Sequence, residues 1–255
     1  NERTMSFMDK KCAVILAAGE GTRMKSKKPK ALAEVLFAPM IDWVISAVKE
    51  SGIDDICVVK GFGAEYLDAH LADSCKTVLQ SERLGTGHAV LQAGSFIEKN
   101  GGDVLVLNGD APFIDADTIR ASLELHTSSN SEVTVITADI DDPQGYGRII
   151  RSSGEFTAIR EQKDCSPAEA EICEVNSGAY WFSAKALLQT LPKLSTNNAA
   201  GEYYLTDCVE MMSRRQAYKS ANPDIVLGAN TRGALLELNQ LARLRKLSQL
   251  MDDGV

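Results

Sequence analysis

The sequence predicts an α/β fold with a doubly wound, mostly parallel sheet, and three observations support this. Short apolar runs rich in β-branched residues alternate with helical patterns as far as residue 140. The first of these runs ends in a glycine turn at Gly19 and Gly21, where we expect positive φ angles. Beyond Asp142 strands follow one another without long helices, which predicts an antiparallel insertion or sheet extension. Folds of this class bind ligands at the carboxyl ends of their parallel strands.

The elements before this change follow in chain order. We expect strands at 13–18, 56–59, 77–79, 104–107 and 133–140, and helices at 40–49, 64–71, 86–96 and 117–126. The helix at 40–49 is typical of the set, because its apolar residues recur at i, i+3, i+4 and i+7 from Ile41. Gly52 is expected to end it.

The second part is expected to form a further wall of the site. Its strands are predicted at 148–150, 156–161 and 174–182, and its helices at 184–191, 205–214 and 232–251. In the last helix leucines recur every three residues from Leu235 to Leu250, so we expect it to pack on the domain first and to project later. This divides the chain into a flexible or non-native start at 1–11, a domain at 12–231 and a helical arm at 232–255.

The composition narrows the class of protein. A chain of 255 residues with 44% hydrophobic and 24% charged residues is typical of a soluble globular protein. The net charge of −8 argues against a nucleic-acid surface, and no apolar run reaches the roughly 18 residues of a membrane span. The six cysteines form no C-x-x-C pair and no secretory segment precedes them, so we expect reduced thiols and a cytoplasmic location. The three histidines are too scattered to predict a metal cluster.

A basic cluster follows the glycine turn. Its five cationic side chains are Arg23, Lys25, Lys27, Lys28 and Lys30. A strand, a glycine turn and a local basic cluster suit polyphosphate, because amides can bind its oxygens and cations can neutralise its charge. A dinucleotide fingerprint would need a third glycine, and a Walker loop would need four residues between its glycines. An ordinary turn beside a solvated or targeting cluster is the plainer alternative.

Several motifs occur in one order along the chain. They are G-x-G-T-R-M-x-S-x-x-P-K (19–30), L-G-T-G-H-A (84–89), N-G-D-A-P (108–112), D-P-x-G-Y-G-R-I (142–149), E-x-K-D (161–164), N-S-G (176–178), G-E-Y-Y-L-T-D (201–207) and G-A-N-T-R (228–232). The first resembles the nucleotide-binding loop of sugar-phosphate nucleotidyltransferases. From about Cys12 to Leu244 the whole set resembles the uridylyltransferase domain of bacterial bifunctional N-acetylglucosamine-1-phosphate uridyltransferase/glucosamine-1-phosphate acetyltransferases.

The resemblance implies a Rossmann-like nucleotidyltransferase fold and a Mg²⁺-dependent reaction. UMP would pass from UTP to N-acetylglucosamine 1-phosphate, giving pyrophosphate and UDP-N-acetylglucosamine, a precursor of cell wall and lipopolysaccharide. Family members continue into a left-handed β-helix that carries the acetyltransferase and is associated with the trimer. No such repeat occurs here, so we expect only the first activity, in a monomer or weak oligomer. Phe37-Ala38 stands where the family usually has Gly-Lys, away from the expected site.

The resemblance also implies roles for individual residues. Arg23 and Lys30 would be catalytic. The nucleotide-binding residues would be Leu16, Ala17, Ala18, Gly19, Lys30, Gln80, Gly85, Thr86, Asn108, Gly109 and Asp110. The sugar-binding residues would be Gly147, Glu161, Asn176, Tyr204, Thr206 and Asn230. Asp110 and Asn230 are hard oxygen ligands suited to Mg²⁺, and the Gln80 amide can pair with a base edge as donor and acceptor.

Read singly, these residues have structural alternatives. Asp110 and Asn230 could be turn residues, and Tyr204 could simply pack, so the order of the motifs is what favours function. Two other functions stay open. One is a nucleotidyltransferase of the same fold with another base or with an acceptor such as glucose 1-phosphate, which the stretch 201–207 argues against. The other is a catalytically silent regulatory binding module, which the presence of Arg23 and Lys30 argues against.

Overall fold

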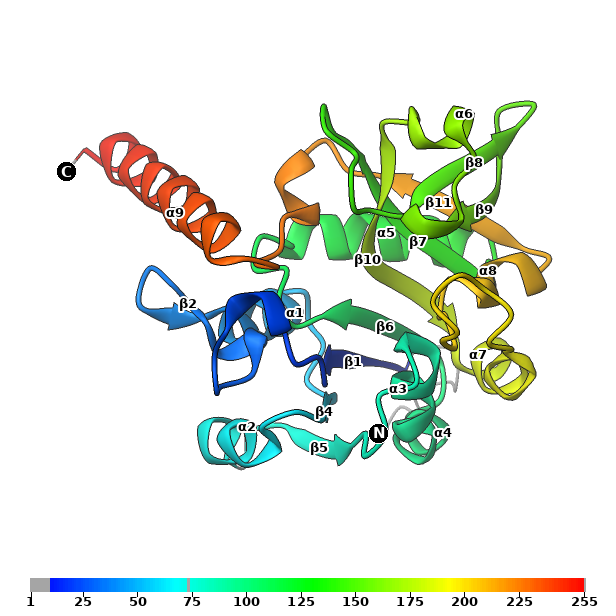
Figure 1. The fold of residues 1–255 in the computed structure, drawn as a ribbon, viewed down its shortest axis with the longest axis horizontal. Coiled ribbons are helices and arrows are strands. Elements are labelled where there is room, and N and C mark those ends of the chain that lie inside the picture. Colours follow the sequence, from blue (N-terminus) through cyan, green and yellow to red (C-terminus); the bar gives the residue numbers. More distant parts are fainter. Residues whose placement is uncertain (1–9, 73, 255) are drawn as a thin grey trace, which may run out of the picture.

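One large sheet runs through the described part of the chain, residues 10–72 and 74–254 of the computed structural model, with helices on both faces (Figure 1). Its strands follow the order β11-β7-β10-β6-β1-β4-β5, with β8 and β9 attached beside β10. The strands are β1 (Lys11–Ala17), β4 (Ile56–Lys60), β5 (Lys76–Leu79), β6 (Asp103–Asn108), β7 (Val133–Asp139), β8 (Arg148–Ser152), β9 (Glu155–Arg160), β10 (Glu174–Ser183) and β11 (Arg215–Lys219). A separate small hairpin joins β2 (Glu34–Val35) to β3 (Ala38–Pro39).

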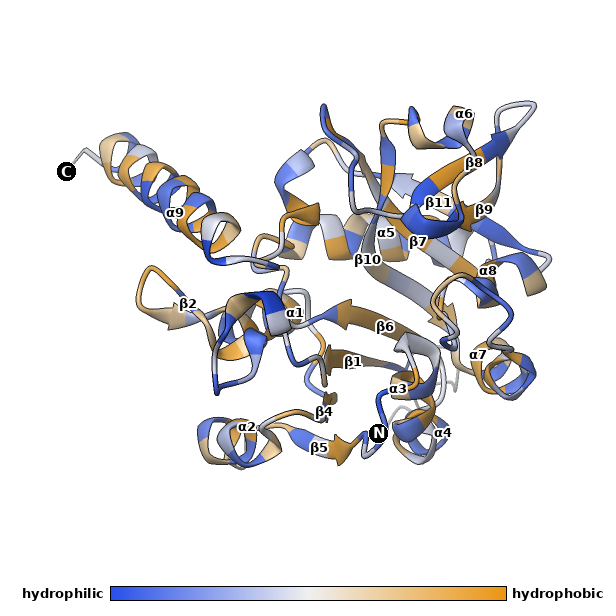
Figure 2. Cartoon of the chain, in the orientation of Figure 1, coloured by the Kyte–Doolittle hydropathy of each residue, from blue (hydrophilic) through white to orange (hydrophobic). Residues whose placement is uncertain are grey.

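The helices lie between these strands in the chain. They are α1 (Met40–Glu50), α2 (Ala64–Leu71), α3 (Thr86–Gln92), α4 (Gly94–Asn100), α5 (Ala116–Ser128), α6 (Pro167–Ala170), α7 (Ala184–Thr190), α8 (Asp207–Met211) and α9 (Arg232–Asp252). Strand β1 shows how they share the sheet: Cys12 and Val14 pack with α3, α4 and α7, whereas Ala13 and Ile15 pack with α1, α2 and α5. Both faces are buried, so the strands β1, β4 and β6 are apolar apart from their polar end residues (Figure 2).

The predicted sheet is confirmed. Strand β1 pairs in parallel with β4 and β6, and β7 pairs in parallel with β11. Strand β10, predicted at 174–182 as part of an antiparallel insertion or sheet extension, does more than extend the sheet. It runs antiparallel between β6 and β7 in the middle of the sheet, where its nearly continuous burial suits a position covered on both faces.

Other boundaries also differ. The helix expected at 86–96 is two helices, α3 and α4, which meet at Ala93 and Gly94. The helix expected at 205–214 is shortened to α8 and is followed by β11, an edge strand whose polar side chains hid it from the pattern. The hairpin β2–β3 and the short α6 were not predicted. Of the start expected at 1–11, residues 1–9 lie outside the described residues, and Lys11 already opens β1.

The last helix packs at its beginning and projects at its end, as expected (Figure 1). Leu238 and Ala242 are buried against Val35, Met40 and Phe113 of the body, whereas Leu244, Leu247 and Met251 are exposed. Phe37, on the β2–β3 hairpin, is 93% exposed and lies outside the pocket described below. Between residues 10 and 254, position 73 apart, no helix is long and apolar enough to cross a bilayer. All six cysteines are free.

Candidate active site

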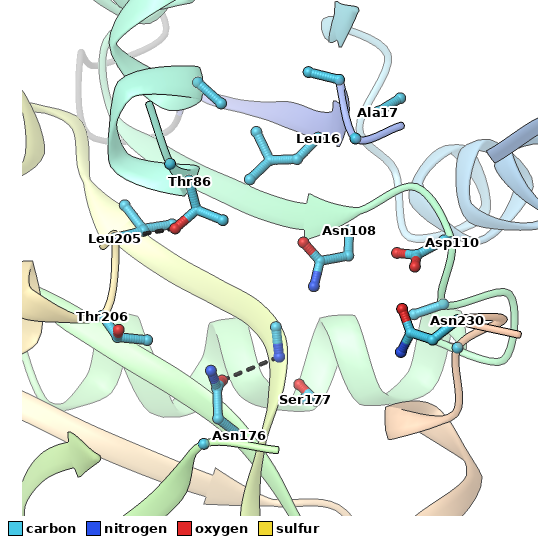
Figure 3. A pocket seen from close by; sticks show the side chains of 18 of the residues that line it. Leu16, Ala17, Thr86, Asn108, Asp110, Asn176, Ser177, Leu205, Thr206 and Asn230 are labelled. Atoms are coloured by element: carbon cyan, nitrogen blue, oxygen red, sulfur yellow. Dashed lines mark hydrogen bonds between the residues drawn. The ribbon is translucent and has the colours of Figure 1, made fainter. Parts of the chain in front are cut away.

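A pocket of about 490 Å³ opens at the carboxyl ends of β1 and β6 and contains most of the residues singled out from the sequence (Figure 3). The predicted residues that line it are Leu16, Ala17, Ala18, Gly19, Lys30, Gln80, Gly85, Thr86, Asn108, Asp110, Gly147, Glu161, Asn176, Thr206 and Asn230. These come from strand ends and loops along almost the whole chain. The fold therefore gathers the separate motifs into one cavity.

Three predicted residues do not line the pocket. Arg23 is exposed on a short 3₁₀ helix, Thr22–Met24. Gly109 lies behind the wall, where its N–H donates to the carbonyl of Leu16 at 2.9 Å. Tyr204 is half-buried near the carboxyl groups of Asp164 and Glu161. Burial and these two carboxyl groups raise the pKa of its phenol to about 12.

The glycine loop after β1 leaves only part of its charge facing the pocket. Gly21 has a left-handed φ of 62°, but Gly19 does not have the positive φ that we expected of it. Gly19 instead lines the pocket with nothing within 4 Å of the place of a Cβ, so backbone and ligand can approach closely there. Lys25, Lys27 and Lys28 are exposed and point elsewhere; of the five predicted cations only Lys30 lines the cavity.

One end of the pocket holds two oxygen ligands and one cation. The Lys30 ammonium makes an ion pair with Asp110, and its Nζ donates to Oδ1 of Asn230 at 2.9 Å. Asp110 and Asn230 face each other across this end in Figure 3. The Lys30 and Asp110 side chains are 19% and 18% exposed, so the pair is only partly screened by water. We call these three residues the phosphate end.

The position of the Lys30 ammonium bears on whether a metal ion would fit at the phosphate end. It shows that the oxygens of Asp110 and Asn230 converge on one cation position. Carboxylate and amide oxygens are hard donors that suit Mg²⁺, which keeps several waters and takes phosphate oxygens as further ligands. Across the described residues no group of three or more His, Cys, Asp or Glu could hold a metal, so this sparse pair would need ligands from substrate.

The opposite wall carries an amide in a fixed orientation. Gln80 follows β5 and is only 4% exposed. Its Nε2 lies 3.1 Å from the carbonyl oxygen of Gly85 and 3.1 Å from Nδ1 of His88. Gly85 has a φ of 113°, and a Cβ there would lie 2.6 Å from the carbonyl oxygen of Tyr203, so only glycine fits. Gln80, Gly85 and Thr86 form what we call the base end.

The third part of the pocket is a buried carboxyl with its hydroxyl partner. Thr206, 4% exposed, donates its Oγ1 hydroxyl to Oε1 of Glu161 at 2.9 Å. Burial raises the pKa of Glu161, and the bond from Thr206 opposes this only in part. Within the part of the chain that the structure describes, no cation pairs with the Glu161 carboxyl, which lines the cavity.

A bulge in β10 aims a second amide into the same region. The pairing of β10 with β7 shifts between Asn176 and Ala179. Oδ1 of Asn176 accepts from the backbone N–H of Gly178 at 3.0 Å (Figure 3). Its Nδ2 donates to the hydroxyl of Tyr180 at 2.6 Å. A Cβ on Gly178 would lie 2.1 Å from Nδ2 of Asn108, so this glycine leaves room for the Asn108 amide. We call Glu161, Asn176 and Thr206 the acceptor end.

Comparison with known proteins agrees with this arrangement. Residues 12–224 match the family described as nucleotidyl transferase. The chain belongs to this family. Among curated proteins, the bifunctional protein GlmU of Pelotomaculum thermopropionicum is 46% identical over 248 residues, which are 95% of this chain and 54% of that protein. The bifunctional protein GlmU of Clostridium novyi is 44% identical over 254 residues, 96% of this chain and 55% of that protein. The chain thus spans about half the length of these relatives.

Solved structures share the fold of this nucleotidyl transferase at low identity. A putative glucose-1-phosphate thymidylyltransferase from Bacillus anthracis aligns with a TM-score of 0.77 at 23% identity, covering 91% of this chain and 95% of that one. A UDP-glucose pyrophosphorylase aligns with a TM-score of 0.74 at 18% identity, covering 92% and 99%. At these identities the likeness establishes the fold alone, and it confirms the predicted α/β class.

Several pocket residues were missed from the sequence. Arg83 lines the cavity and makes an ion pair with Glu20 at its rim. Tyr146 lies between Gly145 and Gly147 in the motif D-P-x-G-Y-G-R-I, in which only Gly147 was given a role. Tyr180 lies in the apolar run of β10, where nothing distinguishes it from core. Only Tyr146 carried a signal, its place in the turn 145–147.

Proposed function

We propose that this nucleotidyl transferase transfers UMP from UTP to N-acetylglucosamine 1-phosphate and releases pyrophosphate. The observation that carries the proposal is that one pocket is lined by Lys30, Asp110 and Asn230, by Gln80, Gly85 and Thr86, and by Glu161, Asn176 and Thr206. The relatives named bifunctional protein GlmU, at 44% to 46% identity, support the same family of reaction. The uridylyltransferase motifs in the sequence support the choice of substrates.

The base end favours uracil. The carbonyl of Gly85 can only accept, so the Gln80 atom beside it is the amide nitrogen. The other Gln80 atom, the carbonyl oxygen Oε1, is then the one available to a base, and it needs a donor. Uracil presents N3–H to such an acceptor, whereas cytosine presents an unprotonated nitrogen at the same place. UTP is therefore expected to be preferred to CTP.

The phosphate end would carry the chemistry. An oxygen of the sugar 1-phosphate forms a bond to the α-phosphorus of UTP, and the bond from that phosphorus to the bridging oxygen breaks, leaving pyrophosphate with the electron pair. Lys30 would bind the phosphates and neutralise the charge that shifts toward the leaving group. Mg²⁺ held by Asp110 and Asn230 would supply further positive charge to the phosphate oxygens. Arg23, which is exposed beside the loop, would make a second contact with the phosphates.

The acceptor end would select the sugar. Glu161 and Asn176 offer acceptor and donor groups to sugar hydroxyls or to an acetamido group. Tyr204 lies nearby with an aromatic face that can cover an acetyl methyl. A pocket for such a small group discriminates by about 10–200-fold in kcat/KM, so glucose 1-phosphate should be a slow substrate.

The test is pyrophosphate release from UTP and Mg²⁺ with a panel of sugar 1-phosphates. We expect N-acetylglucosamine 1-phosphate to give the highest kcat/KM, and CTP to react poorly with it. Equal kcat/KM for glucose 1-phosphate would favour an enzyme of broader acceptor choice. If no sugar 1-phosphate on the panel leads to pyrophosphate release, a catalytically silent binding module is favoured instead.

A further inference from the structure

The base end and the acceptor end are joined by backbone hydrogen bonds between two distant segments, 84–87 and 203–206. The N–H of Tyr203 donates to the carbonyl of Leu84 at 2.8 Å, and the N–H of Gly87 donates to the carbonyl of Tyr203 at 2.8 Å. The first segment carries Gly85 and Thr86 of the base end. The second carries Tyr204 and Thr206 of the acceptor region. A displacement of one segment therefore acts directly on the other.

The third bond between these segments is made by a side chain. The N–H of Leu205 donates to Oγ1 of Thr86 at 3.0 Å, across 119 positions of sequence (Figure 3). Leu205 is 1% exposed, so water cannot replace the hydroxyl as its partner. Thr86 is the first residue of α3, while Leu205 lies directly between Tyr204 and Thr206.

We infer that Thr86 is a positioning residue for the acceptor sugar, although it lies at the nucleotide side of the pocket. Its oxygen fixes the backbone of Leu205, and through it the placement of the two flanking side chains. Thr206 in turn holds Glu161 by its hydroxyl. The orientation of Gln80 depends instead on the carbonyl of Gly85 and on His88, so it does not need the Thr86 oxygen. Loss of the Thr86 acceptor should therefore disturb sugar binding more than base binding.

This inference rests on the proposed function, and the test separates the two. The variants are Thr86→Val, which keeps the shape and removes the acceptor, and Thr86→Ser, which keeps the hydroxyl. Thr86→Ala is a second variant without the acceptor. Alanine favours helix, so this substitution should not disrupt α3, which begins at Thr86. KM for UTP and KM for N-acetylglucosamine 1-phosphate are measured for each variant, together with thermal unfolding.

We expect Thr86→Val and Thr86→Ala to raise KM for the sugar 1-phosphate about 3- to 10-fold, the range of one lost hydrogen bond, with a smaller rise in KM for UTP. Thr86→Ser should restore the wild-type value. A larger rise in KM for UTP, equal rises for both substrates, or no rise in the folded variants would overturn the inference. Absence of activity in the wild type would instead overturn the proposed function.

Discussion

The phosphate end and the acceptor end of the pocket are built in opposite ways. At the phosphate end Lys30 and Asp110 form an ion pair, and each side chain is nearly one-fifth exposed. At the acceptor end Glu161 has no cationic partner within residues 10–72 and 74–254, and Thr206 is buried, while Asn176 is held at both of its amide atoms. The first end has charges that can be exchanged. The second has fixed hydrogen-bonding groups.

The difference follows from what each end would bind. Phosphates carry charge that moves during the reaction, and a long lysine side chain can leave Asp110 and follow it. A sugar is neutral and is told from its analogues by shape and by hydrogen bonds, which need preorganised partners. Strong effects on rate are therefore expected at the phosphate end, and smaller effects on KM and selectivity at the acceptor end.

The largest effect is expected for Lys30→Ala. Removal of one preorganised charge-stabilising group typically lowers kcat about 10²–10³-fold. Pyrophosphate release at saturating substrates measures it. The matched control is Lys28→Ala, an exposed cation of the same loop that does not line the pocket, and it should retain activity. If both variants lose activity equally, the loop acts through its overall charge and Lys30 has no special place.

The next effect is expected for Asp110→Ala and for chelation. Loss of the carboxylate removes the one formal negative charge of the proposed metal pair, so kcat should fall about 10²-fold while the dissociation constant for UTP changes less. Excess EDTA should abolish turnover of the wild type, and added Mg²⁺ should restore it. Asp117→Ala, on the exposed part of α5, is the control. Undiminished turnover in EDTA would contradict the metal assignment.

The same two ends differ in how far the sequence predicted them. At the phosphate end Gly19, Lys30 and Asp110 lie in contiguous motifs at the ends of apolar strands, and this topology places strand ends together. The doubly wound class could also be predicted, because hydrophobic periodicity is a local property of the sequence. What the motif did not reveal is which lysine of the cluster faces inward, because that depends on the path of the loop.

The acceptor end depends on pairings that no local pattern encodes. Glu161 meets Thr206 across 45 positions, and Asn176 is aimed by a bulge within a strand. The placement of β10 between β6 and β7 likewise reflects tertiary pairing, because its apolar run would suit several positions in a sheet. These residues were predicted only through resemblance to a family, and Tyr180, which supports Asn176, was not predicted at all.

A moderate effect is expected for Glu161→Gln. Glutamine can still accept from Thr206 but lacks the charge, so kcat/KM for the sugar 1-phosphate should fall about 10–100-fold, the range for a hydrogen bond to a charged group. The ligand-free variant should nevertheless unfold at a higher temperature near neutral pH. Burial raises the pKa of Glu161, so in the wild type the folded state resists its deprotonation.

The pH dependence of that stability gain has a definite sign. Below the ordinary range of a glutamate both the folded and unfolded wild type are protonated, and the two proteins should differ little. As pH rises the unfolded wild type loses its proton first, so its stability declines relative to Glu161→Gln. Thermal unfolding at several pH values measures the difference. A gain that does not grow with pH would mean that the buried carboxyl is not the cause.

The smallest effect, and the finest test of the comparison, is expected for Tyr180→Phe. The Tyr180 hydroxyl accepts a hydrogen bond from Nδ2 of Asn176 at 2.6 Å. Burial raises the pKa of this phenol, so the hydroxyl stays protonated near neutral pH. Phenylalanine keeps the ring in the core and removes only that partner, while the N–H of Gly178 still holds Oδ1. The Asn176 amide should become less well oriented, and KM for the sugar 1-phosphate should rise about 2- to 10-fold, as for one neutral hydrogen bond. KM for UTP should stay within about twofold, since the base end has its own support.

Tyr218→Phe, on β11 outside the pocket lining, should leave both constants unchanged. If Tyr180→Phe lowered kcat with both KM values intact, the acceptor end would act on the reaction step, and its contrast with the phosphate end would disappear.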